Sequence, residues 1–250
     1  MQKIMLIIGV MSLACNVQAY KIGLCIVATG KYIQFVRPLV ESADNYFCPG
    51  HEKTYFVLTD GEVHEHSHIV RIEQKRLGWP NDALMRPVLW YGHHGALRHM
   101  DYLFNIDADM LFIDYVGDEV LGDLVGVRHP GFVLSRKEDY EKNPFSAAYV
   151  PEDIGQYYFA AGFFGGAHDA FIALLEGVSK TILADKAHNY TAIWHDESHV
   201  NRYFAFHPPT VVLPCSYCYP ENAEGKFWFP QIAGKLLALD KDHAVFQTPL

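Results

Sequence analysis

Apolar runs of strand length alternate with segments of helical periodicity along most of the chain. Residues 20–29 (YKIGLCIVAT) are almost all apolar and end at a Thr-Gly pair, as in a strand that is buried on both faces. Residues 31–47 place apolar side chains on one helical face, and Gly30 lies in the turn between the two segments. A strand, a glycine turn and a helix in this order are the usual beginning of a nucleotide-binding α/β domain.

The same alternation predicts the elements that follow. Strands are expected at 53–59 and 69–72, helices are expected at 82–99 and 167–184, and residues 121–127 form a further apolar segment. Residues 137–149 are polar, and they are predicted to form mobile surface. Residues 157–166 (YYFAAGFFGG) combine aromatic side chains with glycines, which indicates a backbone that another group approaches closely.

Two aspartates interrupt a strongly apolar stretch, residues 103–112 (LFNIDADMLF). The flanking residues predict two buried strands around a short acidic turn, so that Asp107 and Asp109 emerge at a strand end. Two ionised carboxylates this close repel each other, and burying them is costly unless a cation or a proton neutralises them. Oxygen ligands with room for phosphate oxygens suit Mg²⁺ or Mn²⁺ better than Zn²⁺. Since solvated turns often carry the same triplet, the metal interpretation depends on the buried strands beside it.

A second group of chemically active side chains lies in residues 193–203 (IWHDESHVNRY), at the start of a predicted helix. His195 and His199 are four residues apart, which is the spacing of zinc ligands on one helix face. A zinc hydrolase has Glu directly after the first His, where this chain has Asp196. Carboxylates at a helix N-terminus also act as caps, but one cap needs a single acceptor, and Glu197 adds a second carboxylate.

Composition limits the classes of partner. At 250 residues, half of them apolar and a fifth charged, the chain can form one sizeable globular core. The formal net charge of −9 argues against nucleic acid, because no basic stripe is available to neutralise phosphates. Binding of one phosphorylated small molecule remains compatible with this net charge if a metal ion and one or two arginines supply positive charge at the site. Cys215 and Cys218 form a lone C-x-x-C pair, too little for a zinc ribbon.

Residues 1–19 have the organisation of a targeting segment. Lys3 gives a basic start, residues 4–14 form an apolar core, and Val17-Gln18-Ala19 is a small-x-small cleavage pattern. The apolar core is shorter than a membrane-spanning helix requires. We expect a leader that is cleaved or that attaches the chain to a membrane, followed by one domain over residues 20–250.

Four stretches together resemble glycosyltransferase family 6, which includes the blood-group A and B transferases, the α-1,3-galactosyltransferases and bacterial members. They are Ala28-Thr-Gly-Lys-Tyr32, Asp107-Ala-Asp109, the segment 158–166 that ends in FFGG, and Trp194-His-Asp-Glu-Ser198. His129-Pro130 and Tyr219-Pro220-Glu221 extend the resemblance, which covers residues 20–221. It implies the GT-A fold, a single α/β domain with a mixed, mainly parallel central sheet that binds a nucleotide-diphosphate sugar over its strand ends.

The resemblance implies a donor site for a UDP-sugar. Asp107 and Asp109 would bind Mn²⁺, with Mg²⁺ as the alternative, and the ion would bridge to the diphosphate. The other donor contacts would be Val27, Thr29 and Tyr32 at the uridine, Arg86 at the phosphates, and His195 and Asp196 at the sugar. Ala160, Ala161 and Gly162 match the stretch that selects the sugar, and their small size favours N-acetylgalactosamine over galactose.

Glu197 matches the family's candidate catalytic carboxylate. In a retaining transfer it would act either as a nucleophile or as an anion that stabilises an oxocarbenium-like transition state, and the sequence leaves this choice open. His129 and Trp194 match the acceptor pocket, and Glu221 is a weaker acceptor candidate. The implied acceptor is a glycan or glycolipid that contains a β-galactoside, and the transferred sugar would be joined to it in α-1,3 linkage.

Two other functions stay open at this stage. A carbohydrate-binding protein of the same fold would have no need of the full set of Arg86, Asp107, Asp109 and Glu197. A zinc hydrolase would use His195 and His199. The location of the protein is also open, because UDP-sugars are made in the cytoplasm whereas a cleaved leader would direct the chain out of it.

Overall fold

The computed structural model describes residues 18–133, 140–223 and 232–246. The targeting pattern at residues 1–17 therefore lies outside the described part of the chain. Among the described residues, no helix has the length and apolar character needed to cross a membrane.

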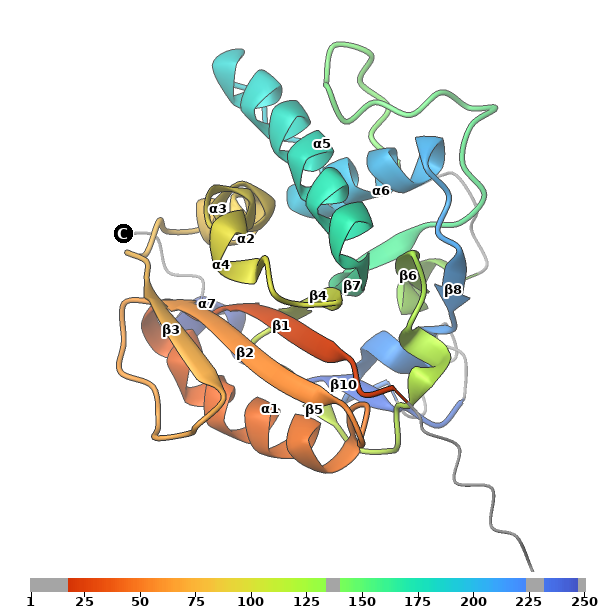
Figure 1. The fold of residues 1–250 in the computed structure, drawn as a ribbon. Helices are drawn as coiled ribbons and strands as arrows, with labels where there is room; N and C mark the ends of the chain where they lie inside the picture. The colour runs from red at the N-terminus through yellow and green to blue at the C-terminus, as the bar shows by residue number, and fades with distance from the viewer. Residues whose placement is uncertain (1–17, 134–139, 224–231, 247–250) are drawn as a thin grey trace, which may run out of the picture.

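A seven-stranded sheet forms the centre of the fold (Figure 1). Its order is β3 (Ile69–Glu73), β2 (Glu52–Thr59), β1 (Lys21–Val27), β4 (Tyr102–Asp107), β7 (Phe159–Ala167), β6 (Leu124–Arg128) and β8 (Val211–Leu213). The pairs from β3 to β4 and the pair β6–β8 are parallel, whereas β7 is antiparallel to both neighbours. The prediction of a mixed, mainly parallel sheet is confirmed.

The order of the strands places a ligand crevice between β1 and β4. From β1 the chain moves outward through β2 and β3, and it then returns to pair β4 with the other edge of β1. Helices that follow two such neighbouring strands diverge, so an open crevice forms at their carboxyl ends. Asp107 is the last residue of β4, and it pairs with Val27 at the end of β1.

Helices cover both faces of the sheet. The longer ones are α1 (Ile33–Tyr46), α5 (His168–Ala187) and α6 (Asp196–Phe206), and the short ones are α2 (Asn81–Leu84), α3 (Arg86–Gly92), α4 (His94–Leu97) and α7 (His243–Phe246). The described residues also form four 3-10 turns, which are η1 (Gly30–Tyr32), η2 (Asp118–Val120), η3 (Pro130–Phe132) and η4 (Cys215–Cys218). Figure 1 shows α1 on one face and α3, α5 and α6 on the other. Each face has its own apolar core.

A small second sheet brings the C-terminal part of the chain to the acidic turn. It consists of β5 (Met110–Phe112), β10 (Leu236–Ala238) and β9 (Tyr219–Pro220). The predicted pair of strands around the acidic turn is confirmed, as β4 ends at Asp107 and β5 begins at Met110. Directly after β10, the Leu239 amide donates to the carbonyl of Asp109 over 2.9 Å, which fixes the following residues beside the turn.

The prediction of one continuous helix at 82–99 is wrong. The segment forms three short helices, α2, α3 and α4, that meet at Met85 and His93. Pro87 has no amide hydrogen, and its ring would collide with the carbonyl of Ala83 in a continuous helix. Gly92 lies at the second break and further weakens helical order there.

Within the described residues 140–149, the prediction of polar surface at 137–149 is only partly right, because Lys142, Pro144 and Phe145 are exposed but other polar residues are not. Glu141 and Ser146 are only 4% and 5% exposed. Buried Asp185 of α5 accepts hydrogen bonds of 2.6 Å from both the Ser146 hydroxyl and the Ala147 amide. Polar side chains are found here in the interior because each has a specific partner, which a count of polar residues does not reveal.

Candidate active site

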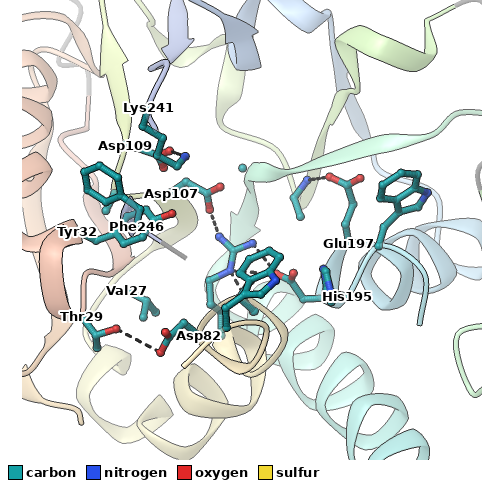
Figure 2. Close-up of a pocket in the computed structure, with 18 residues that line it drawn as sticks. Val27, Thr29, Tyr32, Asp82, Asp107, Asp109, His195, Glu197, Lys241 and Phe246 are labelled. Carbon is teal, nitrogen blue, oxygen red and sulfur yellow. Dashed lines mark hydrogen bonds and ion pairs between the residues drawn. The ribbon is translucent and has the colours of Figure 1, made fainter. Parts of the chain in front are cut away.

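A pocket opens at the carboxyl ends of β1 and β4, where the strand order reverses (Figure 2). It contains twelve of the residues singled out in the sequence, namely Val27, Thr29, Tyr32, Arg86, Asp107, Asp109, Ala161, Gly162, Trp194, His195, Asp196 and Glu197. These residues come from segments up to 170 positions apart in the sequence. The sheet topology therefore brings together the two groups of chemical side chains that the sequence analysis treated separately.

One end of the pocket combines aromatic rings with a polar pair. The rings of Tyr32 and Phe246 meet edge to face, with 5.3 Å between their centroids. The hydroxyl of Thr29 donates to a carboxylate oxygen of Asp82 over 3.4 Å. Val27 lies between these two pairs in the view of Figure 2. An aromatic surface beside hydrogen-bonding groups is a suitable environment for a nucleotide base.

Two cations neutralise the acidic turn at the middle of the pocket. Arg86 forms ion pairs with Asp107 and with Asp196, the latter over 2.6 Å. Lys241 forms an ion pair with Asp109. Burial, followed by repulsion from Arg86, lowers the pKa of Lys241 to about 8. The turn therefore meets the expectation that closely spaced buried carboxylates require positive charge.

The acidic turn also fits a divalent cation. Asp107 and Asp109 both line the pocket and offer only oxygen ligands. Within the described residues, no group of three or more His, Cys, Asp or Glu side chains could hold a metal ion. A magnesium-type ion that is shared with a substrate diphosphate needs no more than one or two protein carboxylates, because phosphate oxygens and water complete its shell. The side chains of Asp107 and Asp109 are the ones that would hold it.

Glu197 is positioned by contacts between α6 and β7. Asn201 donates to the carbonyl of Phe159 over 2.8 Å and accepts from the Phe159 amide over 2.7 Å. The amide of Ala161, two residues along β7, donates to the carboxylate of Glu197 over 2.9 Å. Residue His195, directly before α6, has a φ of 53°, a strained conformation outside glycine that turns the chain into the helix. The carboxylate is thereby fixed at the pocket wall.

The surroundings of Glu197 change its acidity. Burial raises the pKa of Glu197 to about 7, and the nearby Asp196 adds to this rise. The Ala161 amide, the Tyr158 hydroxyl and Arg86 act in the opposite direction. A carboxylic acid whose pKa lies near neutrality in a pocket is typical of a catalytic group.

The raised pKa predicts a pH dependence. If Glu197 acts as an anion, its active form is lost as the pH falls below about 7. We therefore expect kcat/KM for the donor to fall about tenfold per pH unit below that point and to level off above it. A pH profile of the purified protein measures this directly. The Glu197→Gln variant is the control, because its residual activity should not show this fall below pH 7. A wild-type profile that is flat below pH 7 would contradict the role of Glu197 as an anion.

The two histidines of the zinc interpretation lie in different environments. The ring of His195 contacts Trp79 at the pocket, with 4.9 Å between centroids. His199 is buried, and its Nδ1 lies 3.0 Å from the hydroxyl of Thr181 on α5. Burial lowers the pKa of His199 to about 4. His199 thus belongs to the packing of α6 on α5.

Three of the predicted residues do not line the pocket. Ala160 is 2% exposed and points into the core on the α1 side of the sheet, opposite to its neighbour Ala161. His129 stacks on Phe132 with 4.5 Å between centroids, and Phe132 lies 6.2 Å from the ring of Trp194 at the pocket rim. The carboxylate of Glu221 accepts from the Asp240 amide over 2.8 Å in the C-terminal segment.

The structure adds pocket residues that the sequence analysis did not single out. These are Trp79, Asp82, Ala83, Ala108, Lys241 and Phe246. The sequence pattern marks Asp82 only as the beginning of a helix. No motif marks Lys241 or Phe246, since they reach the pocket only through the pairing of β10 with β5. The one available signal was the need for positive charge near Asp107 and Asp109, which does not say where in the sequence the cation lies.

Comparisons of the sequence with known proteins identify its family. The sequence profile of glycosyltransferase family 6 matches residues 10–243. "Histo-blood group ABO system transferase 1" of Rattus norvegicus is 36% identical over 91% of this chain and 69% of its own length. "Globoside alpha-1,3-N-acetylgalactosaminyltransferase 1" of Canis lupus familiaris is 33% identical over 80% of this chain and 61% of its own length. "Alpha-1,3-galactosyltransferase 2" of Homo sapiens is 29% identical over 81% of this chain and 63% of its own length. The chain therefore belongs to glycosyltransferase family 6 and is a hexosyltransferase with an α/β fold of the GT-A type.

Proposed function

We propose that this hexosyltransferase moves N-acetylgalactosamine or galactose from a UDP-sugar to a β-galactoside-containing glycan, in α-1,3 linkage and with retention of configuration. The observation that supports this most is one continuous polar chain across the pocket. Arg86 joins Asp107 of the acidic turn to Asp196, and Glu197 follows Asp196 directly. The group that would face the diphosphate, on β4, and the group that would face the sugar, on α6, are thus linked through Arg86 of α3.

The roles of the residues follow from charge. A divalent ion held by Asp107 and Asp109 would act as a Lewis acid toward the diphosphate. Arg86, already paired with two carboxylates in the pocket, is placed to compensate the negative charge that grows on the departing UDP. The carboxylate of Glu197 lies on the opposite part of the pocket and would either bond to the anomeric carbon or stabilise its positive charge. Trp194 at the rim would contact the acceptor sugar.

The preference for N-acetylgalactosamine rests on Gly162. A methyl group at this position would lie 3.1 Å from the sulfur of Cys218 and 3.5 Å from a carboxylate oxygen of Asp107. Gly162 thus leaves space beside the acidic turn, and a larger residue would reduce the room for an acetamido group. The relatives named for N-acetylgalactosamine and for galactose both belong to the family, so that the choice depends on such local differences.

We expect Gly162→Ala to move the preference toward UDP-galactose by about 1 to 3 kcal/mol, the usual effect of a small steric change in a pocket. The ratio of kcat/KM for the two donors measures it. Because the new methyl group also crowds Cys218, the double variant Gly162→Ala with Cys218→Ala serves as the control. It should recover overall activity and keep the altered ratio. An unchanged donor ratio in both variants would place sugar selection elsewhere.

The direct test is release of UDP from UDP-N-acetylgalactosamine and from UDP-galactose by the purified protein, with Mn²⁺, with Mg²⁺ and with EDTA. We expect metal-dependent release, faster with a lactoside as acceptor. A protein that binds UDP but releases none from either donor, even with an acceptor, would instead be a binding protein of this fold. Release that is equal in Mn²⁺ and in EDTA would remove the metal from the proposal.

A further inference from the structure

Asp82 is the lining carboxylate that contacts Thr29, at the end of the pocket where Val27 also lies. The other four lining carboxylates, Asp107, Asp109, Asp196 and Glu197, belong to the acidic turn and to the start of α6. Figure 2 shows Asp82 beside Thr29 and Val27, away from Asp109 and from Glu197. A negative charge near a diphosphate would oppose binding, so a carboxylate at this end calls for another explanation.

Three donors fix the Asp82 carboxylate in one orientation. One oxygen accepts from the Leu77 amide over 2.7 Å and from the Thr29 hydroxyl over 3.4 Å. The other accepts from Nε of Arg76 over 3.3 Å. The side chain of Asp82 is nevertheless 23% exposed. Since the two oxygens together offer about four lone-pair positions, this fixed group can accept one further hydrogen bond from a ligand in the pocket.

A carboxylate accepts hydrogen bonds and donates none, so it distinguishes ligands by where they carry an N–H group. Uracil presents N3–H between two carbonyl oxygens. Cytosine presents an unprotonated N3 at the same place, and its lone pair would face the negative charge of Asp82. We propose that Asp82 is a specificity-determining residue that selects a uracil base by accepting its N3–H, with Thr29 and Arg76 holding the carboxylate in place. This inference rests on the proposed function, because it takes the donor to be a nucleotide sugar.

A purely structural role for Asp82 makes a different prediction. Asp82 lies in the first turn of α2, and its bond to the Leu77 amide also stabilises the loop before that helix. If this were its whole role, a substitution would weaken the binding of every nucleotide by the same factor. A base-reading role changes the ratio between nucleotides, because only the contact with the base edge differs among them.

The test is calorimetric titration of the full chain with UDP, CDP and GDP in the presence of Mn²⁺. Asp82→Asn keeps an acceptor for the Leu77 amide but replaces one carboxylate oxygen with an amide that can donate to cytosine N3. We expect this substitution to weaken the binding of UDP about tenfold to a hundredfold, which is the usual effect of losing a hydrogen bond to a charged group. CDP should bind as well as before or better, so that the ratio of the association constants for UDP and CDP (the UDP/CDP ratio) falls at least about tenfold.

Asp60→Asn is the matched control. Asp60 is exposed, and its carboxylate accepts from the Gly30 amide over 2.7 Å, so it supports the turn that carries Thr29 without lining the pocket. We expect it to leave the UDP/CDP ratio unchanged. Thermal unfolding of each variant, measured alongside, separates a loss of fold from a loss of recognition.

Three results would overturn the inference. The first is an equal weakening of UDP binding and of CDP binding by Asp82→Asn. The second is tighter binding of GDP than of UDP to the wild-type chain. The third is a wild-type chain that binds none of the three nucleotides, in which case the proposed function fails as well. A wild-type chain that binds UDP and transfers sugar, combined with an unchanged ratio in the variant, refutes the role of Asp82 alone.

Discussion

Replacing Glu197 with glutamine is expected to lower kcat for sugar transfer by at least about a thousandfold, because a group that reacts with or faces the anomeric carbon acts mainly in the transition state. The amide has nearly the same shape and can still accept from the Ala161 amide, which donates to Glu197 over 2.9 Å. The variant therefore removes the charge with little change in packing. Initial rates of UDP release at saturating donor and acceptor measure the effect.

A matched control for this change is Glu176→Gln on the exposed side of α5. Glu176 pairs with Lys180 one helical turn away, and it takes no part in the pocket. We expect it to retain wild-type activity, since exposed pairs of this kind contribute little. If Glu197→Gln kept more than about a tenth of the wild-type kcat, the proposed position of Glu197 opposite the leaving group would be wrong.

Asp109→Asn is expected to lower metal-stimulated transfer by at least about a hundredfold, because a Lewis acid at the leaving group contributes several kcal/mol to the barrier. The substitution keeps one oxygen but removes the charge that binds a divalent ion. It also leaves Lys241 without its carboxylate partner, which adds a repulsive cation beside that ion. Rates measured over a range of Mn²⁺ concentrations, with EDTA as the zero point, give the loss.

Asp114→Asn serves as the comparison for the metal experiment. Asp114 lies two residues after the end of β5, is exposed and does not line the pocket. We expect its response to Mn²⁺ to equal that of the wild-type chain. Wild-type activity that persists unchanged in EDTA, or an Asp109→Asn variant with a normal response to Mn²⁺, would mean that the acidic turn binds no catalytic metal.

The elements that could be predicted from the sequence are those with a strong local pattern. Residues 20–29 and 103–112 are apolar on both faces of a strand, and they form β1, β4 and β5 as expected. The order of these strands in the sheet could not be read from the pattern, because pairing depends on contacts between distant segments. The expectation that Asp107 and Asp109 lie near a nucleotide therefore came from the family resemblance and from charge, not from geometry.

The failures have local physical causes. Apolar periodicity over residues 82–99 was compatible with one helix, and the pattern did not count the amide hydrogen that Pro87 lacks. Glu141 looked like surface, but its carboxylate accepts from the Ile193 amide over 2.9 Å and is buried against that segment. A buried polar residue with a partner 52 positions away gives no signal in a single sequence.

Two of the pocket residues that were missed share one origin. Lys241 and Phe246 lie beyond β10, whose three residues pair with β5 and carry the chain back to the acidic turn. So short a strand has no detectable period, and the residues after it have no motif. A cation for Asp109 was required by electrostatics, but only the pairing of β10 with β5 identifies Lys241 as that cation.

The central claim is that one pocket transfers a sugar from a UDP donor with retention. The measurement that tests it most directly is proton NMR of the product formed from UDP-N-acetylgalactosamine, or from UDP-galactose, with a β-galactoside acceptor and Mn²⁺. We predict a new α-anomeric signal from the transferred sugar, with the linkage at the 3-position of the acceptor galactose. A β-linked product, or no product while the protein binds UDP and the acceptor, would contradict the account.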